Sequence, residues 1–172
     1  REIDETLLSH LAGSATPFES LIDAADPRFQ QPGDMPLKIQ AFCRETNQPV
    51  PRKPGPITRC VLESLALLYR KTLQEIETFT GRQIARIYLM NGSANALLNH
   101  FIANAAHRPL VVAPPDAAAI GNVLVQAIGL GHIKSLEEAR EIAQNSFKAE
   151  ALRPYATAWD AAYERLAHLC SP

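Results

Sequence analysis

The stretch IARIYLMNGSANALLNHFIANAAHRPLVVA, residues 84–113, decides the fold class. Its first run, 84–90, is short and rich in β-branched and aromatic residues, which predicts a buried strand. The spacing then becomes helical, which predicts a helix that Ser93 caps and that ends near His107. Residues 109–113 predict a second strand. Because a strand, a helix and a strand in this order form a βαβ unit, we expect the two strands to be parallel.

Helical periodicity dominates the rest of the chain. In the longest helix we expect Gly55 at the N-cap and Gly81 as a left-handed C-cap. Asp116 can cap the helix after the second strand, and Ser135 with Glu138 forms a capping box for the next. The sequence therefore predicts a helix-rich α/β domain with few parallel strands. The predicted helices outside residues 84–113 span residues 3–12, 36–46, 56–81, 116–129, 135–147 and 155–169.

Small residues follow the second predicted strand, in the run APPDAAAIGN at 113–122. Gly121 would let the helix approach a neighbouring backbone closely, so packing is the expected reason for this composition. Asp116 could in principle be a catalytic carboxylate, but its place before an apolar helix favours a capping role. We assign no catalytic residue here.

Prolines are concentrated in the first third of the chain. They impose extended backbone, so we expect residues 1–56 to be an irregular, Pro-rich connector with short helices, and residues 14–35 to lie outside the core. Residues 57–172 would then form the α/β part. At 172 residues the chain is long enough for one domain with a hydrophobic core.

Composition excludes several classes of protein. The net charge of −1 gives no electrostatic reason to bind nucleic acid. No apolar run is long enough to span a bilayer, and the N-terminus lacks a basic stretch followed by an apolar one, so we expect a cytoplasmic protein without membrane contact. The three cysteines and five histidines show no metal-ligand spacing, so we predict no metal site and no histidine-based catalysis.

The turn between the first strand and its helix is the candidate site. A helix N-terminus attracts phosphate, and a glycine lets a ligand lie against the backbone, so Gly92 is the predicted contact, with Asn91, Ser93 and Asn95 lining the same turn. Two other interpretations remain open. The turn could be an ordinary strand-to-helix connection, and Asn-Gly is also a hairpin signal, although the helical spacing after it argues against a hairpin.

Three stretches together resemble the FGGY carbohydrate kinases, rhamnulokinases among them. They are the run from Pro27 to Ile57, the run CVLESLALLYRKTLQEIETFTG at 60–81, and residues 91–131. The resemblance implies the C-terminal, ATP-binding lobe of a two-lobed kinase with an actin-like, ribonuclease-H-like fold. It also implies transfer of the ATP γ-phosphoryl group to a ketose, L-rhamnulose, with Mg²⁺.

The same resemblance assigns Gly92 and its neighbours in the turn to adenosine binding. It places the sugar site and the catalytic base in an N-terminal lobe, so that lobe and the sugar are the expected partners. Phosphoryl transfer needs donor, metal and acceptor together, so we predict no kinase activity from these 172 residues alone. Cys43 and Cys60 match two family cysteines that can form a disulfide.

Two other hypotheses compete with a working part of a kinase. Rhamnulokinases show three successive glycines where this chain has Asn91 and Gly92, which favours a non-catalytic remnant or interaction module without nucleotide binding. An unrelated dinucleotide-binding βαβ domain ranks last, because its Gly-x-Gly-x-x-Gly fingerprint is missing from the sequence. A sheet without its first strands would leave an open edge, so a homodimer is a further expectation.

Overall fold

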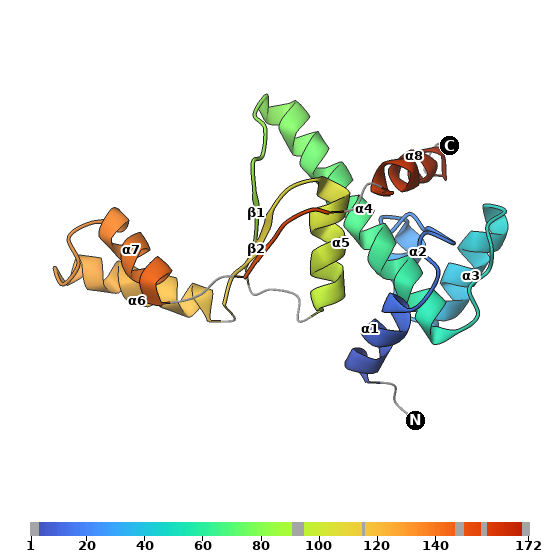
Figure 1. The fold of residues 1–172 in the computed structure, drawn as a ribbon, viewed down its shortest axis with the longest axis horizontal. Coiled ribbons are helices and arrows are strands. Elements are labelled where there is room, and N and C mark those ends of the chain that lie inside the picture. Colours follow the sequence, from blue (N-terminus) through green and yellow to red (C-terminus); the bar gives the residue numbers. More distant parts are fainter. Residues whose placement is uncertain (1–3, 91–94, 115, 147–149, 156–157, 170–172) are drawn as a thin grey trace.

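A computed structural model of the chain describes residues 4–90, 95–114, 116–146, 150–155 and 158–169. Figure 1 shows a helical body around α4, a small sheet beside α5, and an arm made of α6 and α7 that projects away from the body. The elements in order are α1 Glu5–Gly13, α2 Pro27–Gln30, α3 Met35–Glu45, α4 Pro54–Thr80, β1 Ile87–Leu89, α5 Ala96–Ala106, β2 Leu110–Val112, α6 Ala117–Gly129, α7 Leu136–Ser146, β3 Glu150–Leu152 and α8 Trp159–Leu169.

The central helix is α4, of 27 residues. Gly81 ends it in the left-handed conformation with a φ of 65°, which confirms the predicted C-cap. The predicted N-cap is wrong: Lys53 holds that position and Pro54 begins the helix, where a missing N–H costs nothing. Gly55 serves close packing instead, because a Cβ there would lie 2.7 Å from the carbonyl oxygen of Leu11 in α1.

Two apolar clusters form the core of the body. The larger joins α4 and α5 with parts of α1, β2, β3 and α8, and the smaller joins α3 with the start of α4. The larger cluster is made of Ala12, Leu21, Leu62, Ala66, Leu67, Phe101, Ile102, Ala103, Ala105, Leu110, Leu152, Trp159, Ala162 and Leu166. The smaller cluster is made of Ile22, Ile39, Phe42, Cys43 and Cys60.

The connector between α1 and α2 contributes to both clusters, so the expectation that residues 14–35 lie outside the core is wrong. Leu21 and Ile22 are buried although no sheet pairs with them. Side chains form hydrogen bonds with the backbone of these two residues. The Gln48 amide accepts from the N–H of Leu21 and donates to its carbonyl, and the Ser64 hydroxyl accepts from the N–H of Ile22. An extended segment can be buried here because side chains supply the hydrogen-bond partners of these backbone groups.

A buried ion pair fixes the same connector to α4. Arg59 Nε donates to Glu63 Oε1 at 2.7 Å, and only 1% of Glu63 is exposed. The guanidinium also donates to the carbonyl of Ala12 and lies over the ring of Phe101, while Glu63 accepts from the N–H of Phe18. Burial raises the pKa of the Glu63 carboxyl, and the charge and hydrogen bond of Arg59 oppose that shift.

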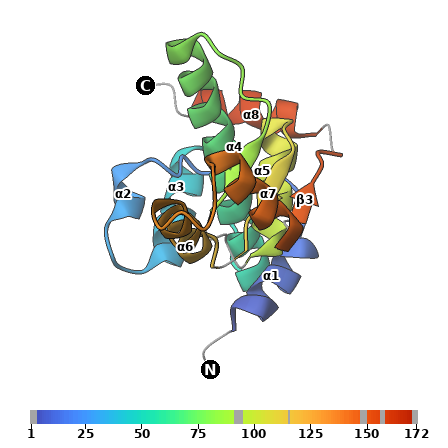
Figure 2. The ribbon, with the colours of Figure 1, turned by 90° about the vertical axis from the view of Figure 1, so that its left-hand side faces the viewer.

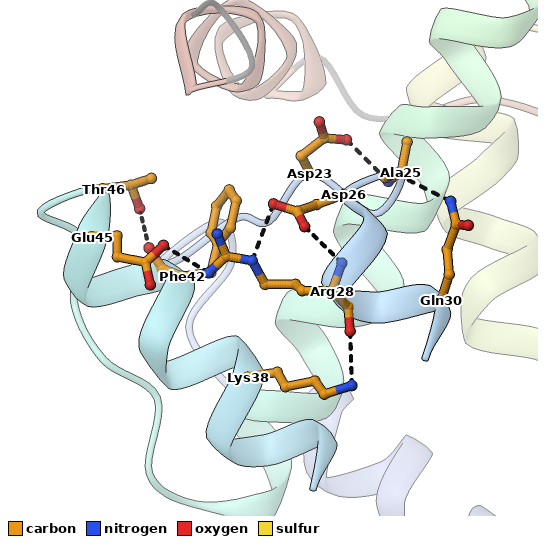
Figure 3. Close-up of polar contacts among 9 residues, drawn as sticks. All are labelled: Asp23, Ala25, Asp26, Arg28, Gln30, Lys38, Phe42, Glu45 and Thr46. Carbon is orange, nitrogen blue, oxygen red and sulfur yellow. Dashed lines mark hydrogen bonds and ion pairs between the residues drawn. The ribbon is translucent and has the colours of Figure 1, made fainter. Parts of the chain in front are cut away.

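A second polar network holds α2 against α3 (Figure 3). Arg28 bridges Asp26 and Glu45 and lies over the ring of Phe42. Lys38 donates to backbone carbonyls at the C-terminal end of α2, that of Arg28 among them at 2.8 Å. These groups are partly exposed to solvent, so the network positions α2 more than it stabilises the fold.

The sheet has the order β1-β2-β3. β1 and β2 are parallel, with Tyr88 opposite Val111, which confirms the predicted βαβ unit. β3 runs antiparallel to β2, and the pattern of its residues predicts no strand there. The expectation that the first strand is buried is wrong, because 60% of Tyr88 is exposed.

The ends of the later helices differ in detail from their predictions. The Ser135 hydroxyl accepts from the N–H of Glu138, which confirms that half of the capping box, and the Glu138 carboxylate accepts from the N–H of Lys134. Asp116 occupies the N-cap position of α6, but its side chain accepts no capping hydrogen bond from the described residues. The last helix begins at Trp159.

Candidate functional site

The predicted nucleotide turn lies between a strand and a helix, as its interpretation requires. β1 ends at Leu89 and α5 begins at Ala96. Asn91, Gly92 and Ser93 lie outside the described residues. Ser93 does not hold the N-cap position of α5, which belongs to Asn95.

Asn95 is the one predicted site residue that the structure describes. Its side-chain oxygen accepts from the N–H of Leu98 at 3.1 Å, and its amide nitrogen donates to the Ser9 hydroxyl at 2.9 Å. The first contact caps α5, and the second ties this helix to α1. The side chain therefore fixes where the turn meets the helix.

A groove opens where the two parallel strands end. Its volume is about 270 Å³, and its walls are almost entirely apolar. The N–H of Ala113 donates to the carbonyl of Leu89 at 3.0 Å and keeps the two strand ends aligned. The lining side chains come from the sheet, α6 and α7: Tyr88, Met90, Val111, Ala113, Pro114, Ala117, Ile120, Gly121, Leu124, Ala143 and Gln144.

Gly121 faces this groove, which corrects its predicted role. Outside the adjacent backbone of α6, no heavy atom of the described residues lies within 4 Å of a Cβ built there, so close packing does not require a glycine. A larger side chain at Gly121 would instead occupy the groove. The small residues of the 113–122 run therefore leave space beside the sheet.

A second cavity, of about 190 Å³, lies between α4 and the end of α5. Its charged groups are already paired: Arg70 and His107 both contact Asp160 of α8, and Arg108 donates to the carbonyl of Ile84. Contacts with His107 and then Arg70 lower the pKa of the Asp160 carboxyl. Arg70 and His107 therefore hold α8 against the body. The charged groups of this cavity are engaged in these contacts and are not available to a ligand.

Neither the cysteines nor the acidic residues form a reactive centre in the described part of the chain. Cys43 and Cys60 are buried free thiols there, in the smaller core cluster. Hydrogen bonding to Cys43 and burial both raise the pKa of the Cys60 thiol, so it stays protonated at neutral pH. Within the described ranges, no group of three or more His, Cys, Asp or Glu side chains could hold a metal ion.

Residues 2–130 match the family described as the FGGY family of carbohydrate kinases, C-terminal domain. The chain belongs to this family. Two relatives named rhamnulokinase support the assignment. The one from Bacteroides thetaiotaomicron is 42% identical over 154 residues, which are 88% of this chain and 32% of that protein. The one from Enterococcus faecalis is 40% identical over 146 residues, or 83% of this chain and 30% of that protein.

Solved FGGY-type structures have the same fold. The xylulose kinase from Rhodospirillum rubrum superimposes with a TM-score of 0.61 at 19% identity, over 95% of this chain and 33% of its own. The Plasmodium falciparum glycerol kinase, solved with ADP, gives a TM-score of 0.67 at 10% identity, over 96% and 32%. The predicted class, a helix-rich α/β part of an actin-like kinase lobe, is confirmed. The chain spans about a third of the length of these FGGY proteins.

The sequence analysis does not predict the groove, although the sequence contains one signal for it. The helix over 117–129 contains no charged residue, which is unusual for a helix that covers one face of a sheet. None of the helices that the structure describes combines the length and apolar character needed to traverse a bilayer.

Proposed function

We propose that this chain is part of an ATP-dependent sugar kinase and that it contributes to adenosine binding. The observation that carries this proposal is the apolar groove at the carboxyl ends of β1 and β2. Ligands of α/β sheets bind outside the carboxyl ends of the strands, and small-molecule sites are concave and mostly apolar. The groove volume, about 270 Å³, is close to the lower end of such sites.

The residues around the groove fit adenosine chemically. Apolar walls suit the two faces of a purine, and the turn with Asn91, Gly92 and Ser93 would meet the ribose and phosphates at the start of α5. Asn95 would hold that turn in place through its contacts with α5 and α1. ATP would arrive with Mg²⁺, which the phosphates themselves and the rest of the enzyme would bind.

The acceptor and the cell compartment belong to the whole protein. The names of the two relatives favour L-rhamnulose as the sugar, and a cytoplasmic location fits an enzyme that uses ATP. We assign the nucleotide-binding part to residues 57–172 and the connector to residues 1–56 of a single domain. The sugar site and the catalytic base would come from an N-terminal lobe that this chain does not include.

Calorimetric titration of the purified chain with Mg-ATP tests the adenosine site. We expect saturable binding at up to about 1 mM nucleotide. Gly121→Leu should abolish it, because the new side chain would occupy the groove, and its Cβ has room beside the described residues. The matched control is Gly129→Leu at the other end of α6, which lies outside the groove and also has space for a side chain.

Two outcomes would contradict the proposal. Silence of the wild-type chain at millimolar nucleotide would support the alternative, a non-catalytic remnant, which the shortened glycine run at Asn91 and Gly92 favours. Equal binding by Gly121→Leu would move the site away from the groove. Separately, we expect no phosphorylation of L-rhamnulose by the chain alone, since donor, metal and acceptor must be held together. Turnover in a coupled assay would refute that expectation.

A further inference from the structure

A third cavity, of about 210 Å³, lies where the connector after α1 and the helix α8 meet the middle of α4. Its walls are mostly apolar and include Ala24, Leu68, Tyr163 and Leu166. Figure 1 shows α8 beside α4 on the side away from the arm, and Figure 2, in which the arm faces the viewer, shows α8 passing behind α4. The cavity shares no lining residue with the groove of the proposed adenosine site, so it is a separate site.

Contacts within the chain fix the walls of this cavity. The Tyr163 hydroxyl donates to Gln74 Oε1 at 2.7 Å, and the Arg70 guanidinium lies 4.4 Å from the centre of the Tyr163 ring. The buried Ser64 hydroxyl donates to one backbone carbonyl and accepts from one backbone N–H. The cavity is therefore formed before a ligand arrives, and a preformed site loses less free energy to the ordering of side chains when it binds.

Two oppositely charged side chains of the cavity retain hydrogen-bonding capacity. Asp23 is half-buried, and one of its carboxylate oxygens accepts from the N–H of Ala25 at 3.0 Å. Figure 3 shows the second oxygen pointing away from that bond, and it accepts from none of the residues that the structure describes. The Lys71 ammonium likewise forms no hydrogen bond or ion pair within the described ranges. A ligand that carries both charges would pair with both side chains.

We propose that this cavity binds a free α-amino acid with an apolar side chain of about the size of leucine. Its ammonium would donate to Asp23, its carboxylate would accept from Lys71, and its side chain would contact Leu68 and Leu166. A dry cavity of roughly 150 Å³ holds a benzene ring, so one of about 210 Å³ has room for leucine.

The paired charges distinguish this ligand from others that a kinase meets. A sugar carries neither charge, and the phosphates of a nucleotide would pair with Lys71 but would be repelled by the Asp23 carboxylate. An amino acid carries the two charges on one carbon, beside an apolar group that suits the walls. Because the walls come from the connector, α4 and α8 together, the bound amino acid would also hold α8 against α4.

Calorimetric titration with L-leucine and two analogues tests the site without nucleotide. We expect saturable binding of L-leucine with a Kd of about 1 mM or lower. The analogue 4-methylpentanoate lacks the ammonium, and 3-methylbutylamine lacks the carboxylate. Each should bind at least about 10-fold more weakly than leucine, because each loses one charge-assisted hydrogen bond. In NMR spectra the amide signals of Ala24 and Leu166 should shift when leucine binds.

Two variants separate the roles of the charged side chains. Lys71→Met should weaken the binding of leucine about 10-fold and leave that of 3-methylbutylamine unchanged. Asp23→Asn should weaken the binding of leucine to a similar extent and should not weaken that of 4-methylpentanoate. It keeps an oxygen for the N–H of Ala25, so the connector should remain in place. The matched control is Lys134→Met, which removes an exposed ammonium outside the cavity and should bind leucine as the wild-type chain does.

Several outcomes would overturn the proposal. They are no saturable binding of leucine, equal binding of leucine and either analogue, and a Lys71→Met variant that binds leucine as tightly as the wild-type chain. Circular dichroism verifies that the variants remain folded. Gly121→Leu in the groove should bind leucine normally, and weaker binding by this variant would place leucine in the groove instead. Leucine binding without ATP binding would leave this inference standing and remove the proposed function, and the reverse result would do the opposite.

Discussion

The body and the arm of this chain differ in whether they bury their apolar side chains. The body packs α4 and α5 against each other and buries Leu67 and Ile102 completely. The arm joins α6 to α7, and its helix α6 buries none of its described residues although it is the more apolar in composition. Apolar composition therefore does not show whether a helix is covered within this chain. It shows only that the helix needs a cover, which the body has and the arm lacks.

Amide hydrogen exchange should show the largest difference between the two regions. We expect amides in the buried part of α4 and in α5 to open only with global unfolding, and those of α6 to open locally because few contacts hold the arm. We expect α5 to be protected at least about 1,000-fold more than α6. Comparable protection of both helices would show that the arm belongs to the cooperative unit, and the comparison would fail.

Breaking the buried ion pair should cause the largest loss of stability. Arg59→Met leaves Glu63 buried without its partner, which should lower the free energy of unfolding by about 3–5 kcal/mol in urea titrations. The matched control is Glu45→Gln, which breaks an exposed pair with Arg28 and should cost no more than about 1 kcal/mol.

The same variant should be sensitive to pH. Without Arg59, burial alone raises the pKa of Glu63 in the folded state above its unfolded value. The folded state then binds more protons than the unfolded state between the two pKa values, so stability falls as the pH rises. The loss should be smaller near pH 4 than at pH 7. An equal loss at both values would indicate that Arg59 acts through packing alone.

Truncation of core and arm residues should sharpen the comparison further. Ile102→Ala removes a fully buried side chain from the larger cluster and should cost about 2–5 kcal/mol. Val123→Ala in α6 should change the free energy of unfolding by no more than about 0.5 kcal/mol, because the side chain is exposed. Thermal or urea denaturation measures both, and a loss above 1 kcal/mol at Val123 would show that the arm is already covered.

A small, pH-dependent effect is expected where α8 meets the body. Contacts with His107 and Arg70 lower the pKa of Asp160, so its contribution is present above the unfolded pKa of about 4 and is lost as the pH falls through the folded value. Asp160→Asn should therefore cost at most about 1 kcal/mol at pH 7 and less at pH 3. Urea titrations at pH 7 and pH 3 distinguish this linkage from a pH-independent loss.

The nucleotide site was only partly predictable from the sequence. The strand and helix that flank the turn were predicted, and Asn95 was found, although its observed contacts are with α5 and α1. The apolar groove beside the turn was not predicted, because its walls come from β1, β2, α6 and α7 at once. The predicted roles of Asn91, Gly92 and Ser93 stay predictions.

The sequence by itself determined the local structure of this protein. Helix periodicity, the left-handed end at Gly81 and the strand–helix–strand order depend on neighbours a few residues apart, so they can be read from the chain. Only the tertiary structure decided the burial of Leu21, which depends on the distant side chain of Gln48, and the role of Gly55, which depends on the approach of α1. The exposure of Tyr88 likewise depends on which strands are present, because burial is a property of neighbours and not of the residue itself.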